Sequence, residues 1–215
     1  MQFQPSVERH RKLVEKYAGD IPVDFLLAWM DKESNGKVDA VSPMGERGLF
    51  QVFPGDGEQK MLKLSDADFD KLLTSADFAV KIGVKAANYY KNFGDKLLKQ
   101  AGVTWRGGSV WKLVKLHHAV FGMPKYTILA FVRTNGRGPH SFTELKDFAE
   151  DAAARNIDLV PGNKKFSKKL RALTVRWFKN ADETGSVIPD EPGGAGGEIV
   201  EAEPATDENQ GELFG

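Results

Sequence analysis

Glu33 is the residue of this sequence that is best placed to act as an acid. Leu26 and Met30 lie on the apolar face of a predicted helix, and continuing their spacing of three and four residues places Glu33 on that face. Burial there disfavours an ionised carboxylate, so we expect a raised pKa and a protonated carboxyl near neutral pH. Such a group can protonate the oxygen of a glycosidic bond as the sugar departs. The alternative is an ordinary exposed glutamate at a helix end.

The segment that begins at Glu33 contains several short motifs in a fixed order. They are Glu33-Ser34, Ser42-Pro43 with Gly45, and Gly48-Leu49-Phe50-Gln51. In order and spacing they resemble the lytic transglycosylases (SLT type) and goose-type lysozymes, in which a catalytic Glu-Ser pair closes a helix and precedes Ser-Pro-x-Gly and Gly-Leu-Met-Gln. A weaker resemblance covers residues 79–83 and 87–90, similar to the family's glycine-containing helix. The resemblance spans about half of the chain.

The resemblance implies a peptidoglycan-cleaving enzyme with Glu33 as catalytic acid and base. Lytic transglycosylases need one glutamate, because the substrate's own acetamido group and 6-hydroxyl attack the anomeric carbon and leave a 1,6-anhydro-muramic acid end. Ser34, Gln51 and Tyr89 are the expected substrate-binding residues, since hydroxyl and amide groups can bond both carboxyl and acetamido groups. Capping of the loop is the alternative role for Ser34 and Gln51.

A hydrolase would need a second carboxylate as nucleophile or base. Asp39 and Glu46 follow Glu33 and are the candidates, although neither has comparable spacing. We therefore expect lyase chemistry, with a lysozyme-type hydrolase as the alternative.

The family's later Tyr-Asn-Ala-Gly motif is altered in this sequence. Its best match is residues 116–120, Leu-His-His-Ala-Val, where only the alanine is retained. His117 is a candidate to replace the tyrosine as partner of Glu33, and an ordinary helix histidine is the alternative. The departure also favours a second hypothesis, a noncatalytic glycan-binding or virion or secretion protein that keeps the fold.

The periodicity of apolar residues predicts a mainly α protein, a lysozyme-like helical domain with a small loop or β-hairpin region. Pro22 opens the helix that carries Glu33, and capping boxes at Ser65 and Ser141 mark helix starts near Asp66 and Phe142. Five glycines and two prolines make residues 34–57 a loop. The other predicted helices cover residues 6–17, 76–93, 109–120, 125–134 and 166–178.

Charge divides the chain into a basic body and an acidic tail. Residues 1–180 hold 30 Lys or Arg and 20 Asp or Glu, whereas residues 181–215 hold ten acidic and no basic residues. We expect one domain over residues 1–180, in which residues 141–180 are either integral or an accessory helical extension, and a disordered tail over residues 181–215. The tail's partner is open, and Gln210, Leu213 and Phe214 resemble a sliding-clamp peptide only faintly.

The basic body fits an anionic polymer partner, and the motifs after Glu33 favour peptidoglycan strands over nucleic acid. The edge formed by Lys125, Arg133 and residues 136–138 is either a binding surface or a solvated helix end. No metal or other cofactor is expected, because the chain lacks cysteine and its four histidines lack metal-ligand spacing. No apolar run is long enough for a membrane span, and no removable signal is evident, so we expect delivery by a phage particle, by lysis or by a dedicated secretion route.

Overall fold

The computed structural model describes residues 2–120 and 123–189. Within these ranges the regular secondary structure is helical, which confirms the predicted mainly α, lysozyme-like class. The helices are α1 (Pro5–Glu8), α2 (Arg11–Tyr17), α3 (Val23–Ser34), α4 (Glu58–Met61), α5 (Asp66–Lys71), α6 (Ala76–Gln100), α7 (Gly108–Ala119), α8 (Met123–Asn135), α9 (Phe142–Ala154) and α10 (Lys164–Gly185). The predicted first helix is divided into α1 and α2 at Arg9 and His10, and the short helix α4 had not been predicted.

Local capping explains where several helices begin. The Ser65 hydroxyl accepts a hydrogen bond from the Asp68 N–H, and the Asp68 carboxylate accepts one from the Ser65 N–H, which forms the predicted capping box of α5. The Ser141 hydroxyl accepts the N–H of Glu144 at the start of α9. These contacts satisfy N–H groups that lack a partner within the helix.

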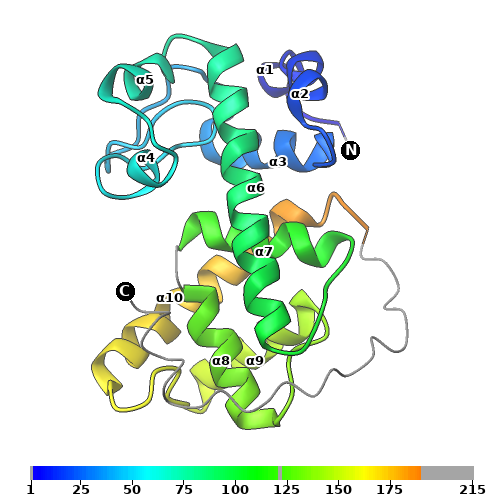
Figure 1. Ribbon diagram of the computed structural model, residues 1–215, viewed down its shortest axis with the longest axis vertical. Coiled ribbons are helices and arrows are strands. Elements are labelled where there is room, and N and C mark those ends of the chain that lie inside the picture. Colours follow the sequence, from blue (N-terminus) through cyan, green and yellow to red (C-terminus); the bar gives the residue numbers. More distant parts are fainter. Residues whose placement is uncertain (1, 121–122, 190–215) are drawn as a thin grey trace.

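Helix α6 connects two hydrophobic cores. It runs vertically through Figure 1, with α1–α5 at its upper part and α7–α10 at its lower part. The first core includes residues of α3, the following loop and the first half of α6, whereas the second includes Leu97 and Leu98 of α6 and residues of α7–α10. Helix α7 contributes to both, since Trp111 and Val114 pack in the first core and Leu113 and Leu116 in the second.

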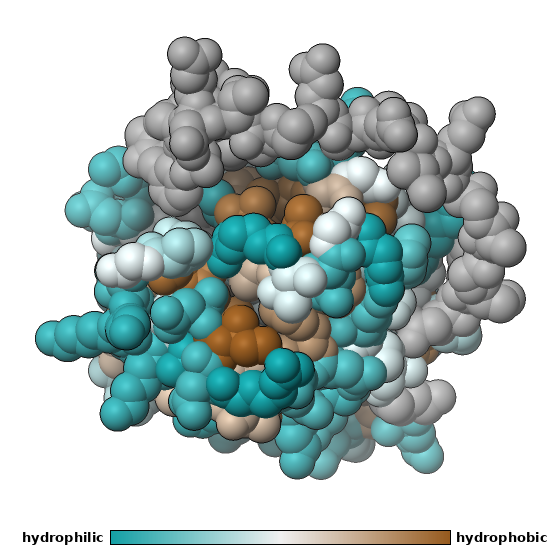
Figure 2. Space-filling view, turned by 90° about the horizontal axis from the view of Figure 1, so that it is seen from below, coloured by the Kyte–Doolittle hydropathy of each residue, from teal (hydrophilic) through white to brown (hydrophobic). Residues whose placement is uncertain are grey.

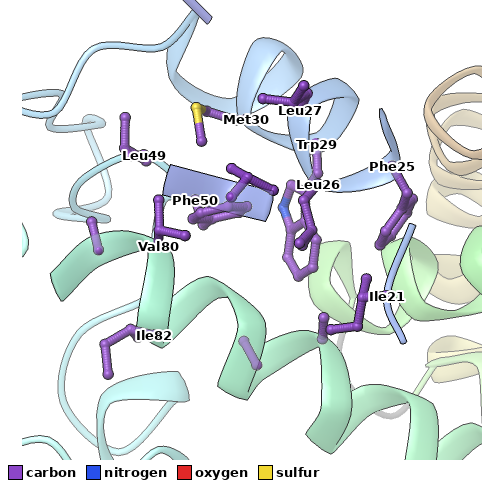
Figure 3. Close-up of a cluster of buried hydrophobic side chains, with 14 of the residues drawn as sticks. Ile21, Phe25, Leu26, Leu27, Trp29, Met30, Leu49, Phe50, Val80 and Ile82 are labelled. Carbon is purple, nitrogen blue, oxygen red and sulfur yellow. The ribbon is translucent and has the colours of Figure 1, made fainter. Parts of the chain in front are cut away.

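The loop after α3 is anchored on α6 by Phe50. The Phe50 ring is buried between α3 and α6, beside the indole of Trp29, with ring centroids 5.4 Å apart (Figure 3). Gly83 makes this position available, because a Cβ atom on Gly83 would lie 2.4 Å from the Phe50 ring. The glycine of α6 and the aromatic residue of the loop thus form one packing unit that fixes the loop against the helix.

We expect Gly83→Ala to destabilise the protein by about 1–3 kcal/mol, because the added methyl group forces a buried ring to move. Gly94→Ala in the same helix is the matched control, since its Cβ would meet no atom closer than a methyl group of Leu113, at 3.0 Å. There the intrinsic gain of about 1 kcal/mol for alanine over glycine in a helix should offset the contact. Urea unfolding of both variants measures the difference, and equal stabilities would contradict the proposed packing role.

Helix α10 continues past the predicted end of the folded domain at residue 180. Ala181 and Thr184 are buried, and Val187 and Ile188 pack against the first core. Asp182 pairs with Lys112 of α7 at 3.2 Å. The predicted boundary is therefore too early, because acidic residues near the helix end are held by basic partners. Residues 190–215, the remainder of the predicted tail, lie outside the described residues, as does the clamp-like peptide.

The lower end of the molecule, seen from below in Figure 2, presents mostly hydrophilic residues around a few apolar ones. Among the described residues, no helix combines the length and the apolar character needed to cross a bilayer.

Candidate active site

Glu33 lies in the last turn of α3, next to a buried stretch of that helix. The helix is apolar on most sides from Phe25 to Met30 and ends at Asn35, whose left-handed conformation (φ 53°) turns the chain into the loop. The Glu33 side chain retains 21% exposure. It is thus neither a core residue nor an ordinary exposed glutamate, and a ligand can still reach it.

Ser34 and Gln51 hold the loop in place. The Ser34 hydroxyl is buried and lies within hydrogen-bond distance of the carbonyl oxygens of Met30, at 3.1 Å, and Leu49, at 2.8 Å. The Gln51 amide donates to the carbonyl oxygens of Ala40 and Gly48. These contacts match the capping alternative for both residues. The predicted small hairpin reduces to isolated β-bridges that Arg47 makes with Val41 and Val52.

Lys115 of α7 is the closest charged partner of Glu33. Its Nζ lies 2.5 Å from Glu33 Oε1, and its side chain is only 1% exposed. Burial by itself raises the pKa of Glu33, but the attraction of Lys115 and His118 and the hydrogen bond from Lys115 outweigh it and lower the pKa below its ordinary value. The expectation of a raised pKa is therefore wrong for this structure, because the buried helix end faces a buried cation.

His118 lies between two carboxylates. Its Nδ1 is 3.6 Å from Glu33 Oε1, and its Nε2 is 3.7 Å from Glu58 Oε1. Glu58 is buried at the start of α4, where its carboxylate accepts hydrogen bonds from the Tyr90 hydroxyl and from the N–H of Phe53, the latter at 2.9 Å. Burial and the nearby Glu58 carboxylate strongly raise the pKa of Tyr90. Tyr90 therefore remains a neutral donor that keeps Glu58 in place.

A cavity of about 710 Å³ adjoins this cluster. Its lining residues are Met44, Glu46, Phe53, Asp56, Gly57, Glu58, Lys60, Met61, Tyr89, Tyr90, His118, Ala119 and Trp177. The predicted residues Tyr89 and Glu46 are among them, and Tyr89 is 39% exposed. Glu33 is not a lining residue but contacts His118, which is. Asp39 is exposed on the loop, outside the lining.

His117 points away from Glu33. Its ring is fully buried, stacked on Tyr90 with centroids 6.4 Å apart and packed edge-on against Phe93. Within the described part of the chain, neither of its ring nitrogens has a hydrogen-bond partner. The sequence had suggested His117 as the partner of Glu33. In the structure, His118 and Lys115 make this contact instead.

Three residues of the cluster were not proposed from the sequence as partners of Glu33: Lys115, His118 and Glu58. Lys115 is 82 positions from Glu33 in sequence, and α4 is a single turn without a clear period. The sequence did contain one indication of these partners. Lys115 and His118 are three residues apart and therefore lie on the same face of the helix, whereas His117 lies on another face.

The mainly helical fold is that of the lysozyme-like class, and Glu33 ends a buried helix near the cavity through its contact with His118. Residues 13–109 match the family model of the transglycosylase SLT domain, which confirms the predicted SLT type for this segment. SLT domains are typically lytic transglycosylases of peptidoglycan, so the match supports this class of enzyme for residues 13–109. It includes Glu33 and Glu58 and ends before Lys115 and His118. Neither a curated protein nor a solved structure gave a match.

Proposed function

We propose that this protein is a peptidoglycan lytic transglycosylase in which Glu33 serves as both acid and base. Glu33 protonates the oxygen between muramic acid and glucosamine as that bond breaks, and then accepts the proton of the muramic acid 6-hydroxyl as it attacks the anomeric carbon. The product carries a 1,6-anhydro end. The observation that carries the proposal is the position of Glu33, within the SLT-matched segment, at the end of α3 next to the cavity.

The lining of the cavity supports a sugar polymer as ligand. Tyr89 and Trp177 offer aromatic rings, and Glu46, Glu58 and Lys60 offer polar groups at the same cavity. Binding sites for sugars and other small ligands combine apolar and aromatic surface with a few polar groups that fix orientation. A volume of about 710 Å³ lies within the usual range for such sites.

The choice between lyase and hydrolase depends on a second carboxylate. Glu46 lines the cavity, Asp39 does not, and Glu58 is engaged by Tyr90 and the backbone. Glu58 is therefore poorly suited to be a nucleophile, and Glu46 is the remaining candidate. A lyase needs no second carboxylate, so whether Glu46 is required separates the two mechanisms.

Digestion of purified peptidoglycan, with the released muropeptides identified by mass, tests the proposal. We expect anhydro ends, which are lighter by one water molecule than reducing ends. Reducing ends would replace the lyase with a lysozyme and direct attention to Glu46. A known muramidase digesting the same preparation controls for substrate quality.

The second candidate function is noncatalytic glycan binding, which the Glu33–Lys115 ion pair favours because an ionised carboxylate has no proton to donate. Under this hypothesis no muropeptides appear, yet the protein sediments with insoluble peptidoglycan, and Trp177→Ala weakens this association. Absence of both cleavage and sedimentation would reject both functions.

A further inference from the structure

The ion pair between Glu33 and Lys115 poses a problem for an acid catalyst. The acid must hold a proton at the moment the sugar leaves, whereas a cation 2.5 Å away favours the carboxylate form. With only 1% of its side chain exposed, Lys115 has little access to water that would weaken this attraction.

We infer that Lys115 is a positioning residue that restricts the acid form of Glu33 to acidic pH, so that the enzyme's activity falls as the pH approaches neutrality. This inference rests on the proposed function for its effect on catalysis. The electrostatic relation between the two side chains can be tested without any catalysis.

The geometry leaves Lys115 few other arrangements. It projects from the middle of α7, whose neighbouring residues are buried on both sides, and its Nζ lies 6.0 Å from the centre of the Trp29 ring and 3.5 Å from Nδ1 of His118. A lysine so enclosed needs an anionic partner, because an unpaired buried ammonium is costly. Glu33 fills this role.

Among the described residues, the basic groups that lie within 4 Å of the Glu33 carboxylate come from one helix, α7, which supplies Lys115 and His118. The far side of His118 faces Glu58 of α4, which itself accepts the Tyr90 hydroxyl of α6. The attraction of His118 for the Glu33 carboxylate is weaker than that of Lys115, and Glu58 lies against the other ring nitrogen of His118. Lys115 is the group nearest to Glu33, so its removal should have the largest effect.

The test uses the full-length protein with Lys115→Met and Lys115→Gln. Methionine removes the charge and the donor, whereas glutamine keeps an N–H donor, so an effect common to both variants reports on charge. Lys112→Met is the matched control, because Lys112 lies on the same helix, is also buried and pairs with Asp182 instead of Glu33. Circular dichroism verifies that each variant is folded.

The first readout is the titration of the Glu33 carboxyl by carbon-13 NMR, assigned by its loss in Glu33→Gln. We expect its midpoint to rise by one pH unit or more in both Lys115 variants, the usual size of the effect of an adjacent charge, and to remain unchanged in Lys112→Met. An unchanged midpoint in both Lys115 variants, or a rise in Lys115→Met alone, would overturn the inference.

The second readout is the pH profile of muropeptide release. A rise of one unit in the Glu33 midpoint makes the acid form roughly tenfold more abundant above that midpoint, so we expect roughly tenfold or greater activity near neutral pH. A shifted titration together with an inactive wild type would refute the proposed function and leave the role of Lys115 intact. An active wild type whose profile and titration are both unaffected by the Lys115 variants would refute the role of Lys115.

Discussion

Glu33→Gln should slow muropeptide release roughly 10²- to 10⁴-fold, because an amide cannot supply the proton that the departing sugar requires. The measurement is the initial rate of release from purified peptidoglycan at the pH of maximal wild-type activity. Glu46→Gln serves as the control, since Glu46 lines the same cavity without contacting the Lys115 and His118 cluster. For this control we expect a loss of less than tenfold if the enzyme is a lyase.

The interpretation of Glu33→Gln requires a check on folding, because it leaves the buried ammonium of Lys115 without a counter-charge. The double variant Glu33→Gln/Lys115→Met removes both charges and should recover stability without recovering activity. Wild-type rates in either variant would show that Glu33 is not the acid.

A second large effect is expected from His117 at acidic pH. Full burial lowers the pKa of His117 from 6.5 to about 3. Between these two values the unfolded chain binds a proton that the folded chain excludes. The free energy of unfolding therefore has its full value, as far as His117 is concerned, above pH 6.5. It decreases by about 1.4 kcal/mol per pH unit as the pH falls from 6.5 toward 3.

The loss amounts to about 2 kcal/mol between pH 7 and pH 5, a window in which most carboxylates remain ionised. Urea unfolding at the two pH values measures it in the wild type and in His117→Phe, which keeps an aromatic ring next to Tyr90 and Phe93. We expect the variant to lose clearly less stability than the wild type. A smaller acid effect remains in both proteins, because burial also lowers the pKa of His10. Identical slopes would contradict this role for His117.

The elements that were predicted well are those fixed by neighbours in sequence. Ser65 and Ser141 cap their helices through residues three positions away, and the apolar period of α3 places Glu33 at its end. The altered motif at residues 116–120 includes His118, which lies next to Glu33. Each of these features is encoded within a few turns of chain.

The parts that were missed depend on contacts between distant segments. The pKa of Glu33 was given the wrong direction because its partner, Lys115, comes from a helix 82 residues later. Helix α7 is buried on nearly all sides, so its hydrophobic pattern does not indicate which side faces α3, and His117 was chosen where His118 makes the contact. The helical end of the folded chain was missed because the pairing of Asp182 with Lys112 is also long-range.

The placement of α7 between the two cores has a mechanical consequence. The acid is fixed to one core, while the ammonium that controls it belongs to a helix that also packs in the other core. The attraction between two charges depends on their separation and is strongest away from water. A small shift of α7 relative to α3 would therefore change the ionised fraction of Glu33 without any substitution.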